Sequence, residues 1–106
     1  MDISNLRKMT KGWFIGDFEP TILRTSMFEV AVKYYRAGDR EEAHLHKIAT
    51  EVTAVVTGAV KMGNRLLKAG DIALVHPGEV VEFEAVTDAS TAVVKVPSVK
   101  EDKYKS

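Results

Sequence analysis

The stretch GDREEAHLHKIATEVTAVVTG, residues 38–58, decides the fold and the site of this 106-residue chain. Side chains two positions apart on a strand point to the same side, so His44 and His46 are expected to project together. The carboxylate of Glu51, after a bend in the chain, can return to the same interior space. Two imidazoles and one carboxylate with open positions suit divalent Mn, Fe, Ni or Zn. The stretch therefore predicts a metal site at these three residues.

Short alternating segments flank this stretch on both sides. Over residues 27–35 apolar and polar residues alternate, which is a strand period rather than a helix period. Glu29 and Lys33 on this strand are expected to be solvated charges. Further strands, one pair of them a hairpin, are predicted at residues 44–47, 51–57, 60–67, 72–75, 80–85 and 91–96. About eight short strands with frequent turn signals and no helical stripe predict an all-β sandwich or barrel.

Composition and charge narrow the class of protein. Lys and Arg number 15 and Asp and Glu number 15, so no overall field favours nucleic acid or an anionic membrane surface. No stretch approaches the roughly 18 apolar residues that span a bilayer, and the first residues lack a signal-peptide core. Cysteine is absent, which excludes disulfides and thiolate ligands. We expect a cytoplasmic protein with an N-terminal arm at 1–12, a barrel at 13–98 and a charged tail at 99–106.

The spacing within residues 38–58 resembles the first sequence motif of the cupin family. That motif is glycine, five residues, His-x-His, four residues, Glu, six residues and glycine. Every fixed position is matched here, by Gly38, His44, His46, Glu51 and Gly58. The resemblance covers about residues 28–96. It implies a double-stranded β-helix, the jelly-roll barrel of cupins, around one buried polar site.

The second cupin motif, which usually supplies a fourth metal ligand, is degenerate in this chain. Its two glycines fall at Gly70 and Gly78, but Val81 stands where the family has a histidine. By strand parity Val81 and Phe83 share one face, which we expect to point inward. Glu79 has the same parity and would reach the site only if the turn bends it inward. These three residues are candidate neighbours of the substrate or of the fourth ligand position.

His76 stands at the proline position of the second motif, directly before Pro77. A histidine beside a proline in a turn is more often structural or exposed than functional. At the mouth of a barrel it would instead act as a general acid or base, because its unperturbed pKa lies near neutrality. His76 is therefore the candidate catalytic residue.

Three functions fit these residues, and the sequence does not decide whether the chain is an enzyme. The first is a metal-binding cupin that acts on or binds a small polar molecule, a sugar derivative or an organic acid. The second is a metal-free sugar isomerase or epimerase, and the third is a non-catalytic module that binds a small ligand. The chain is also similar to uncharacterised single-domain bacterial cupins at residues 46–51 and 77–79, some of which occur with surface-polysaccharide or sugar-nucleotide pathways.

A barrel this short leaves strand edges and apolar outer faces to protect. Closed homodimers are the commonest form of association among soluble oligomers, and pairing covers exposed edges. We therefore expect a homodimer, with residues 13–18 lying across the sheet of the partner.

Overall fold

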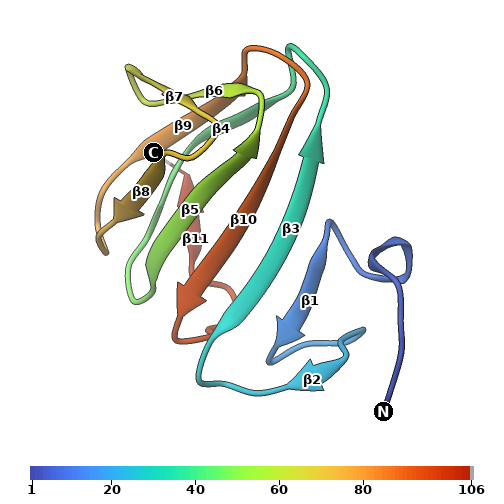
Figure 1. Ribbon diagram of the computed structural model, residues 1–106. Coiled ribbons are helices and arrows are strands. Elements are labelled where there is room, and N and C mark those ends of the chain that lie inside the picture. The colour runs from blue at the N-terminus through green and yellow to red at the C-terminus, as the bar shows by residue number, and fades with distance from the viewer. Residues whose placement is uncertain (106) are drawn as a thin grey trace.

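Two β-sheets face each other in the computed structural model, which describes residues 1–105 (Figure 1). One sheet has the strand order β2-β1-β3-β10-β5-β8, and the other has the order β11-β4-β9-β6-β7. The strands are β1 Trp13–Gly16, β2 Leu23–Arg24, β3 Glu29–Tyr35, β4 Arg40–His46, β5 Thr50–Thr57, β6 Ala59–Met62, β7 Arg65–Lys68, β8 Ile72–Val75, β9 Val81–Ala85, β10 Ala89–Val96 and β11 Lys103–Lys105. A short 3-10 helix, η1, spans Leu6–Lys8, and no helix in the described part of the chain is long and apolar enough to cross a membrane. The all-β, two-sheet architecture predicted from the sequence is confirmed.

Most predicted strands are present, and one is longer than expected. β8 occupies the predicted residues 72–75, and the β6–β7 hairpin turns between the paired residues Met62 and Arg65. Residues 40–42, expected in a loop because they are charged, belong to β4 instead. They become part of the strand by pairing with β9, where Arg40 lies opposite Glu84.

Side chains inside the barrel change from polar to apolar along the strands. On β5 the alternate residues Glu51 and Thr53 line a polar cavity, whereas Val55, the next in that series, is buried among apolar side chains. The buried hydrophobic cluster comprises Val55, Val60, Phe83, Ala85 and Ala89. The barrel therefore has an apolar end that stabilises the fold and a polar end that is open to a ligand.

β3 presents to the interior the face that the sequence assigned to solvent. Ala31 is fully buried, Lys33 lines the cavity and Glu29 is partly buried. The expectation that Glu29 and Lys33 are solvated was wrong. β3 lies in the middle of the six-stranded sheet, and its outer face carries the other residues of the alternation, including Tyr34, which is 74% exposed.

Segments near both termini pair with the barrel of their own chain. β1 pairs with β3 of its own chain, with Trp13 opposite Ala31. The placement of residues 13–18 across a partner's sheet stays a prediction. β11, within the charged tail, pairs with β4 and places Lys103 opposite His46. Both segments therefore contribute residues to the polar end of the barrel.

Candidate ligand and metal site in the barrel

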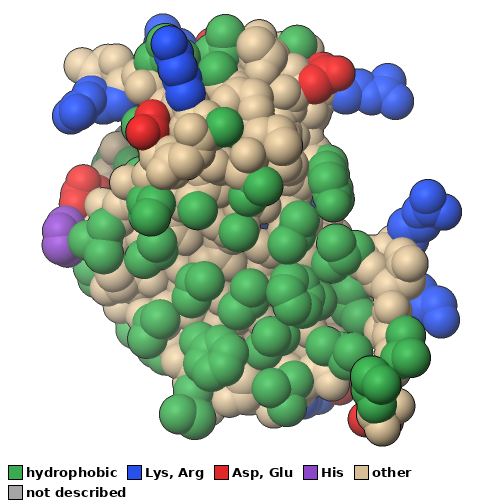
Figure 2. All heavy atoms as spheres, viewed as in Figure 1, with side chains coloured by type: hydrophobic (Ala, Val, Ile, Leu, Met, Phe, Trp, Pro, Cys, Tyr) green, Lys and Arg blue, Asp and Glu red, His purple; other side chains and the backbone are tan. Residues whose placement is uncertain are grey.

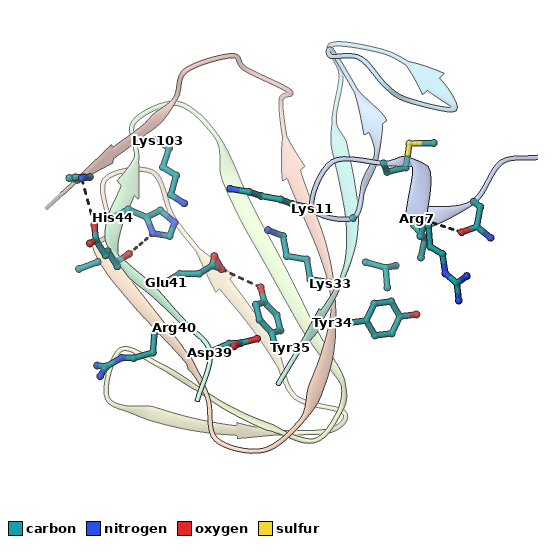
Figure 3. Close-up of a pocket in the computed structure, with 18 residues that line it drawn as sticks. Arg7, Lys11, Lys33, Tyr34, Tyr35, Asp39, Arg40, Glu41, His44 and Lys103 are labelled. Carbon is teal, nitrogen blue, oxygen red and sulfur yellow. Dashed lines mark hydrogen bonds and ion pairs between the residues drawn. The ribbon is translucent and has the colours of Figure 1, made fainter. Parts of the chain in front are cut away.

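A cavity of about 240 Å³ occupies the polar end of the barrel between the two sheets. It opens into a wider groove between the N-terminal arm, β3 and β4 (Figure 3). The side chains that line both spaces are Lys11, Lys33, Tyr35, Glu41, His44 and Lys103. The groove is therefore the entrance to the cavity.

A β-bulge in β4 brings three polar side chains to the cavity face. Glu41 lies opposite Phe83 and His44 lies opposite Val81, so three steps along β4 match two steps along β9. A regular pleat would place positions 41 and 44 on opposite faces, and the extra residue of the bulge restores a common face. Glu41, His44 and His46 consequently all line the cavity.

Each cavity histidine has one ring nitrogen fixed by a backbone carbonyl. Nδ1 of His44 lies 2.9 Å from the carbonyl oxygen of Glu42, and Nδ1 of His46 lies 3.1 Å from that of Asp102. A carbonyl oxygen only accepts, so the hydrogen bond assigns the proton to Nδ1 and leaves a lone pair on Nε2. Burial lowers the pKa of His44 and further favours the neutral ring. The two rings meet edge to face with their centroids 5.3 Å apart.

Nε2 of His46 is buried and has no hydrogen-bond partner within residues 1–105. It lies 3.6 Å from Oε1 of Glu51, which is too long for a hydrogen bond. Burial would raise the pKa of Glu51, but the neighbouring His46 and Lys95 outweigh burial and lower it, so the carboxylate is ionised at neutral pH. An unpartnered imidazole nitrogen beside a carboxylate matches the donor chemistry of a divalent-cation site.

The three expected ligands share one cavity, but they are not already gathered around a common point. Within residues 1–105 no group of three or more His, Cys, Asp or Glu side chains is arranged to hold a metal ion. Val81 faces the cavity directly opposite His44, at the position where the cupin resemblance places a fourth ligand. The chain thus offers three donors and an apolar wall.

The remaining candidate residues lie in different places. His76 is exposed and does not line the cavity, because Val75 before it points inward and the chain then turns. The expected catalytic role of His76 therefore finds no support in its position. Its backbone N–H donates to Oε1 of Glu79 at 3.0 Å, and this turn brings Glu79 to the cavity wall. Phe83 is 6% exposed and packs against Tyr35 with ring centroids 4.6 Å apart.

The sequence reasoning missed the lysines of the cavity. Lys33 of β3 and Lys95 of β10 reach over the ring of Trp13, with Nζ 5.2 Å and 4.9 Å from the ring centroid. Lys11 and Lys103 line the same cavity from the arm and the tail. The sequence did contain one indication that Lys33 faces inward. It lies two residues from Ala31, a small residue suited to burial, and so shares its face of the strand. The balanced net charge of the chain concealed this local concentration of cations.

The same architecture occurs in solved structures. A protein with a double-stranded β-helix domain from Klebsiella pneumoniae subsp. pneumoniae is 27% identical over 73% of each chain, with a TM-score of 0.64. An RmlC-like cupin from Shewanella frigidimarina is 22% identical over 74% of this chain and 72% of that one, with a TM-score of 0.64. An oxalate oxidase in complex with glycolate is 20% identical over 74% of this chain and 45% of the oxidase, with a TM-score of 0.65. No protein-family model matches the sequence, and no curated protein matches it.

The topology of the chain and its similarity to solved structures indicate the same fold. The two facing sheets are those of the double-stranded β-helix, and the similar structures include proteins named as cupins and as double-stranded β-helix proteins. Three residues of the first motif, His44, His46 and Glu51, line the interior of that barrel. This chain has the double-stranded β-helix fold of the cupins.

Proposed function

We propose that the barrel binds a divalent metal ion through His44, His46 and Glu51 and acts on, or binds, a small polar molecule. The proposal rests chiefly on Nε2 of His46, a buried nitrogen without a hydrogen-bond partner in residues 1–105. An unsatisfied buried polar group costs about 1–3 kcal/mol, and a bound cation would remove that cost. When bound, the ion would polarise a carbonyl or hydroxyl of the ligand as a Lewis acid.

The lining of the cavity limits which molecules fit. Its volume of about 240 Å³ lies below the range of roughly 300–1,000 Å³ found for drug-sized ligands, so the ligand is small. Val75 and Val81 form an apolar wall, and Glu41, which accepts a hydrogen bond from the Tyr35 hydroxyl at 3.2 Å, forms a polar one. A sugar derivative or an organic acid matches this mixed lining. Glycolate, the molecule bound in the similar oxalate oxidase structure, is a small organic acid.

Metal analysis of the purified protein tests the proposal. The protein is stripped with a chelator and loaded separately with Mn(II), Ni(II) or Zn(II), and bound metal per chain is measured beside thermal melting. We expect close to one ion per chain and a higher Tm with metal, because a ligand that binds only the folded state stabilises it. His46→Ala should remove both effects. His76→Ala, which changes the exposed histidine outside the cavity, should leave both intact.

Wild-type protein that binds no metal, or His46→Ala that binds as much as wild type, would contradict the metal site. The metal-free alternatives then separate by one measurement. Exchange of a carbon-bound substrate proton with solvent deuterium would identify an isomerase or epimerase. Saturable binding of a sugar or acid without such exchange would identify a binding module.

A further inference from the structure

The ring of Trp13 lies between two lysines that come from neighbouring strands. Trp13 is opposite Ala31 of β3, and Ala31 is opposite Val93 of β10. Lys33 lies two residues from Ala31, and Lys95 lies two residues from Val93 in the opposite direction along the strand pair. Both ammonium groups therefore converge on the ring from its two ends, at 5.2 Å and 4.9 Å from the centroid.

The cavity lysines form no close ion pair in the described part of the chain, although Lys95 lies opposite Glu29 and Glu51 in the strand register. Ion pairs within 4.0 Å among residues 1–105 have Arg24, His46 and Lys105 as their basic members. None involves the four lysines that line the cavity, which are Lys11, Lys33, Lys95 and Lys103. Lys33 and Lys95 are partly buried, whereas Lys11 and Lys103 are exposed. A partly buried cation without a close ion pair lowers stability, so the position of Lys33 needs a reason.

Each carboxylate of the cavity already accepts a hydrogen bond from a neutral group of the chain. Glu41 accepts a hydrogen bond from the Tyr35 hydroxyl, Glu51 accepts one from the Thr53 hydroxyl, and Glu79 accepts one from a backbone N–H. These are the three acidic residues that line the cavity, against four lysines. The lysines are therefore available to an acidic group that comes from outside the chain.

A buried hydroxyl adds a further donor beside the lysines. Thr91 is 0% exposed, lines the cavity and lies opposite Lys33 in the β3–β10 pair. Its Oγ1 has no hydrogen-bond partner within residues 1–105. Ammonium and hydroxyl groups both donate, and the oxygens of a carboxylate or phosphate accept. The entrance has the same character, since Lys11, Lys33 and Lys103 reach into the groove in Figure 3.

We infer that Lys33 and Lys95, with the Thr91 hydroxyl, bind an oxyanion in the barrel, so that the ligand is a small acid rather than a neutral sugar. This inference rests on the proposed binding of a small polar molecule, and it does not require the metal. The lysines lie on the wall formed by β3 and β10, whereas His44 and His46 lie on β4 in the other sheet. An acidic group on the lysine wall leaves the rest of the ligand facing the histidines.

Trp13 is the only tryptophan, so its fluorescence reports directly on this wall. Metal-free protein is titrated with glycolate, malonate, glucuronate and inorganic phosphate, and with the neutral counterparts ethylene glycol, malonamide and glucose. At least one anion should give a saturable change in emission at millimolar concentration or below, and the neutral compounds should give none. If the carboxylates give a saturable change and phosphate gives none, the ligand is a carboxylic acid. If phosphate gives a saturable change and the carboxylates give none, the ligand is phosphorylated. Either result supports the oxyanion site.

Matched variants assign the binding to the two lysines. Lys33→Met and Lys95→Met should each weaken the saturating anion at least about tenfold, the factor that corresponds to 1.4 kcal/mol. Lys61→Met, which removes an exposed lysine of β6 outside the cavity, should leave the affinity unchanged. Lys33→Arg and Lys95→Arg keep the charge and should retain most of the binding. If the Met variants lose anion affinity but keep a cooperative melting transition, the loss of affinity does not come from unfolding.

Collisional quenching supplies a second readout that needs no knowledge of the ligand. Compared with free N-acetyltryptophanamide, Trp13 should be quenched relatively more by iodide than by caesium. Lys33→Met should reduce quenching by iodide while quenching by neutral acrylamide stays the same. The inference is overturned if no anion saturates, if neutral compounds act equally, or if both Met variants bind as wild type does. His46→Ala should still bind the anion, so failure of the metal site and failure of the oxyanion site give different results.

Discussion

Asp102 fixes the orientation of His46, which lies 56 residues earlier in the chain. Its carbonyl oxygen is 3.1 Å from Nδ1 of His46, and its carboxylate accepts hydrogen bonds from the backbone N–H groups of Lys47, Ile48 and Ala49. Burial would raise the pKa of Asp102, but these hydrogen bonds outweigh it and lower the pKa below 3.8. One residue of the tail therefore holds the bend between β4 and β5 and orients a candidate ligand.

Asp102→Ala should destabilise the fold, and it should affect metal binding less, because the backbone carbonyl that faces Nδ1 of His46 remains. The substitution leaves three backbone N–H groups without their charged acceptor, at a cost of about 3 kcal/mol. Metal affinity should fall by less than the roughly 10–100-fold that is typical when a metal-ligating histidine loses its orienting partner altogether. Urea unfolding and metal titration measure the two effects. Lys100→Ala, an exposed change nearby, is the control, and equal stability of the two variants would refute the role of Asp102.

Val81→His should raise divalent-metal affinity, because it places a third imidazole, and so a fourth ligand, opposite His44 in the barrel. Without metal the variant should lose about 1–3 kcal/mol, since a buried apolar group becomes a polar one without a partner. Metal should restore that loss, and His44→Ala in the same background should abolish the rescue. Thermal melting with and without metal, beside metal content, gives the answer. A variant that gains neither metal nor stability would place Val81 outside the site.

Lys33→Met should stabilise the protein at neutral pH. Burial above all lowers the pKa of Lys33 below 10.5, so the unfolded chain holds this proton more tightly than the folded one. Stability of the wild type should therefore rise with pH through the folded-state pKa, whereas the variant lacks this contribution. The advantage of the variant should be greatest near pH 7 and should shrink as the pH rises from the folded-state pKa toward 10.5. Parallel urea titrations across this range measure it, and an advantage independent of pH would contradict the titration of Lys33.

Gly58→Ala should destabilise the fold much more than Gly70→Ala. Both glycines have positive φ, +77° and +96°, which costs a residue with a Cβ about 1–2 kcal/mol. A Cβ at Gly58 would also meet the carbonyl oxygen of Asp88, whereas the space around Gly70 is open. This steric clash should add about 1–3 kcal/mol. Denaturant midpoints of the two variants test the difference. Equal midpoints would contradict the prediction, because they would show that the backbone around Gly58 shifts to relieve the clash at little cost.

We expect the outer face of the six-stranded sheet to be buried at the interface of a homodimer. Hydrophobic side chains cover much of the face seen in Figure 2. On β8, at one edge of the six-stranded sheet, Ile72 and Leu74 are 69% and 53% exposed. Contiguous apolar surface of this kind marks an interaction site. Light scattering at micromolar concentration should return twice the 11.7 kDa chain mass. Leu74→Glu should give monomers, while Leu66→Glu, equally exposed on β7, should stay dimeric; a monomeric wild type would refute the dimer.

Local patterns were sufficient to predict most strands and the cavity position of the first motif. The alternation in β5 and β8 and the two-residue turn of the β6–β7 hairpin are properties of neighbouring residues. The bulge in β4 is different, because it depends on how Glu41 and His44 align with β9. No count along β4 alone shows that these two side chains face the same way. The orienting role of Asp102 was hidden for the same reason, since its partners are distant in sequence.

The orientation of β3 shows why an apolar face was a poor guide to the interior. Residues such as Val30 lie on the more apolar face of this strand, which alternation rules would turn inward. The structure turns Ala31 and Lys33 inward instead. A barrel that encloses a polar site has a polar inner lining, and its apolar outer face is free to pack against another surface. Which face of β3 points into the barrel becomes clear only when its pairing with β1 and β10 is known.

The pairing of β3 with β10 also determines when the cavity comes into being during folding. Glu29 lies opposite Lys95, so these strands meet only after a long loop has closed, whereas the β6–β7 hairpin closes over two residues. Pairing of segments that are distant in sequence loses chain entropy before the new contacts compensate for that loss, and it is therefore slow. A chain with only its hairpins formed has no lysine wall, no oriented histidines and nothing for a ligand to stabilise. Pairing of β3 with β10 should therefore set how soon a newly synthesised or refolding chain is able to bind a ligand.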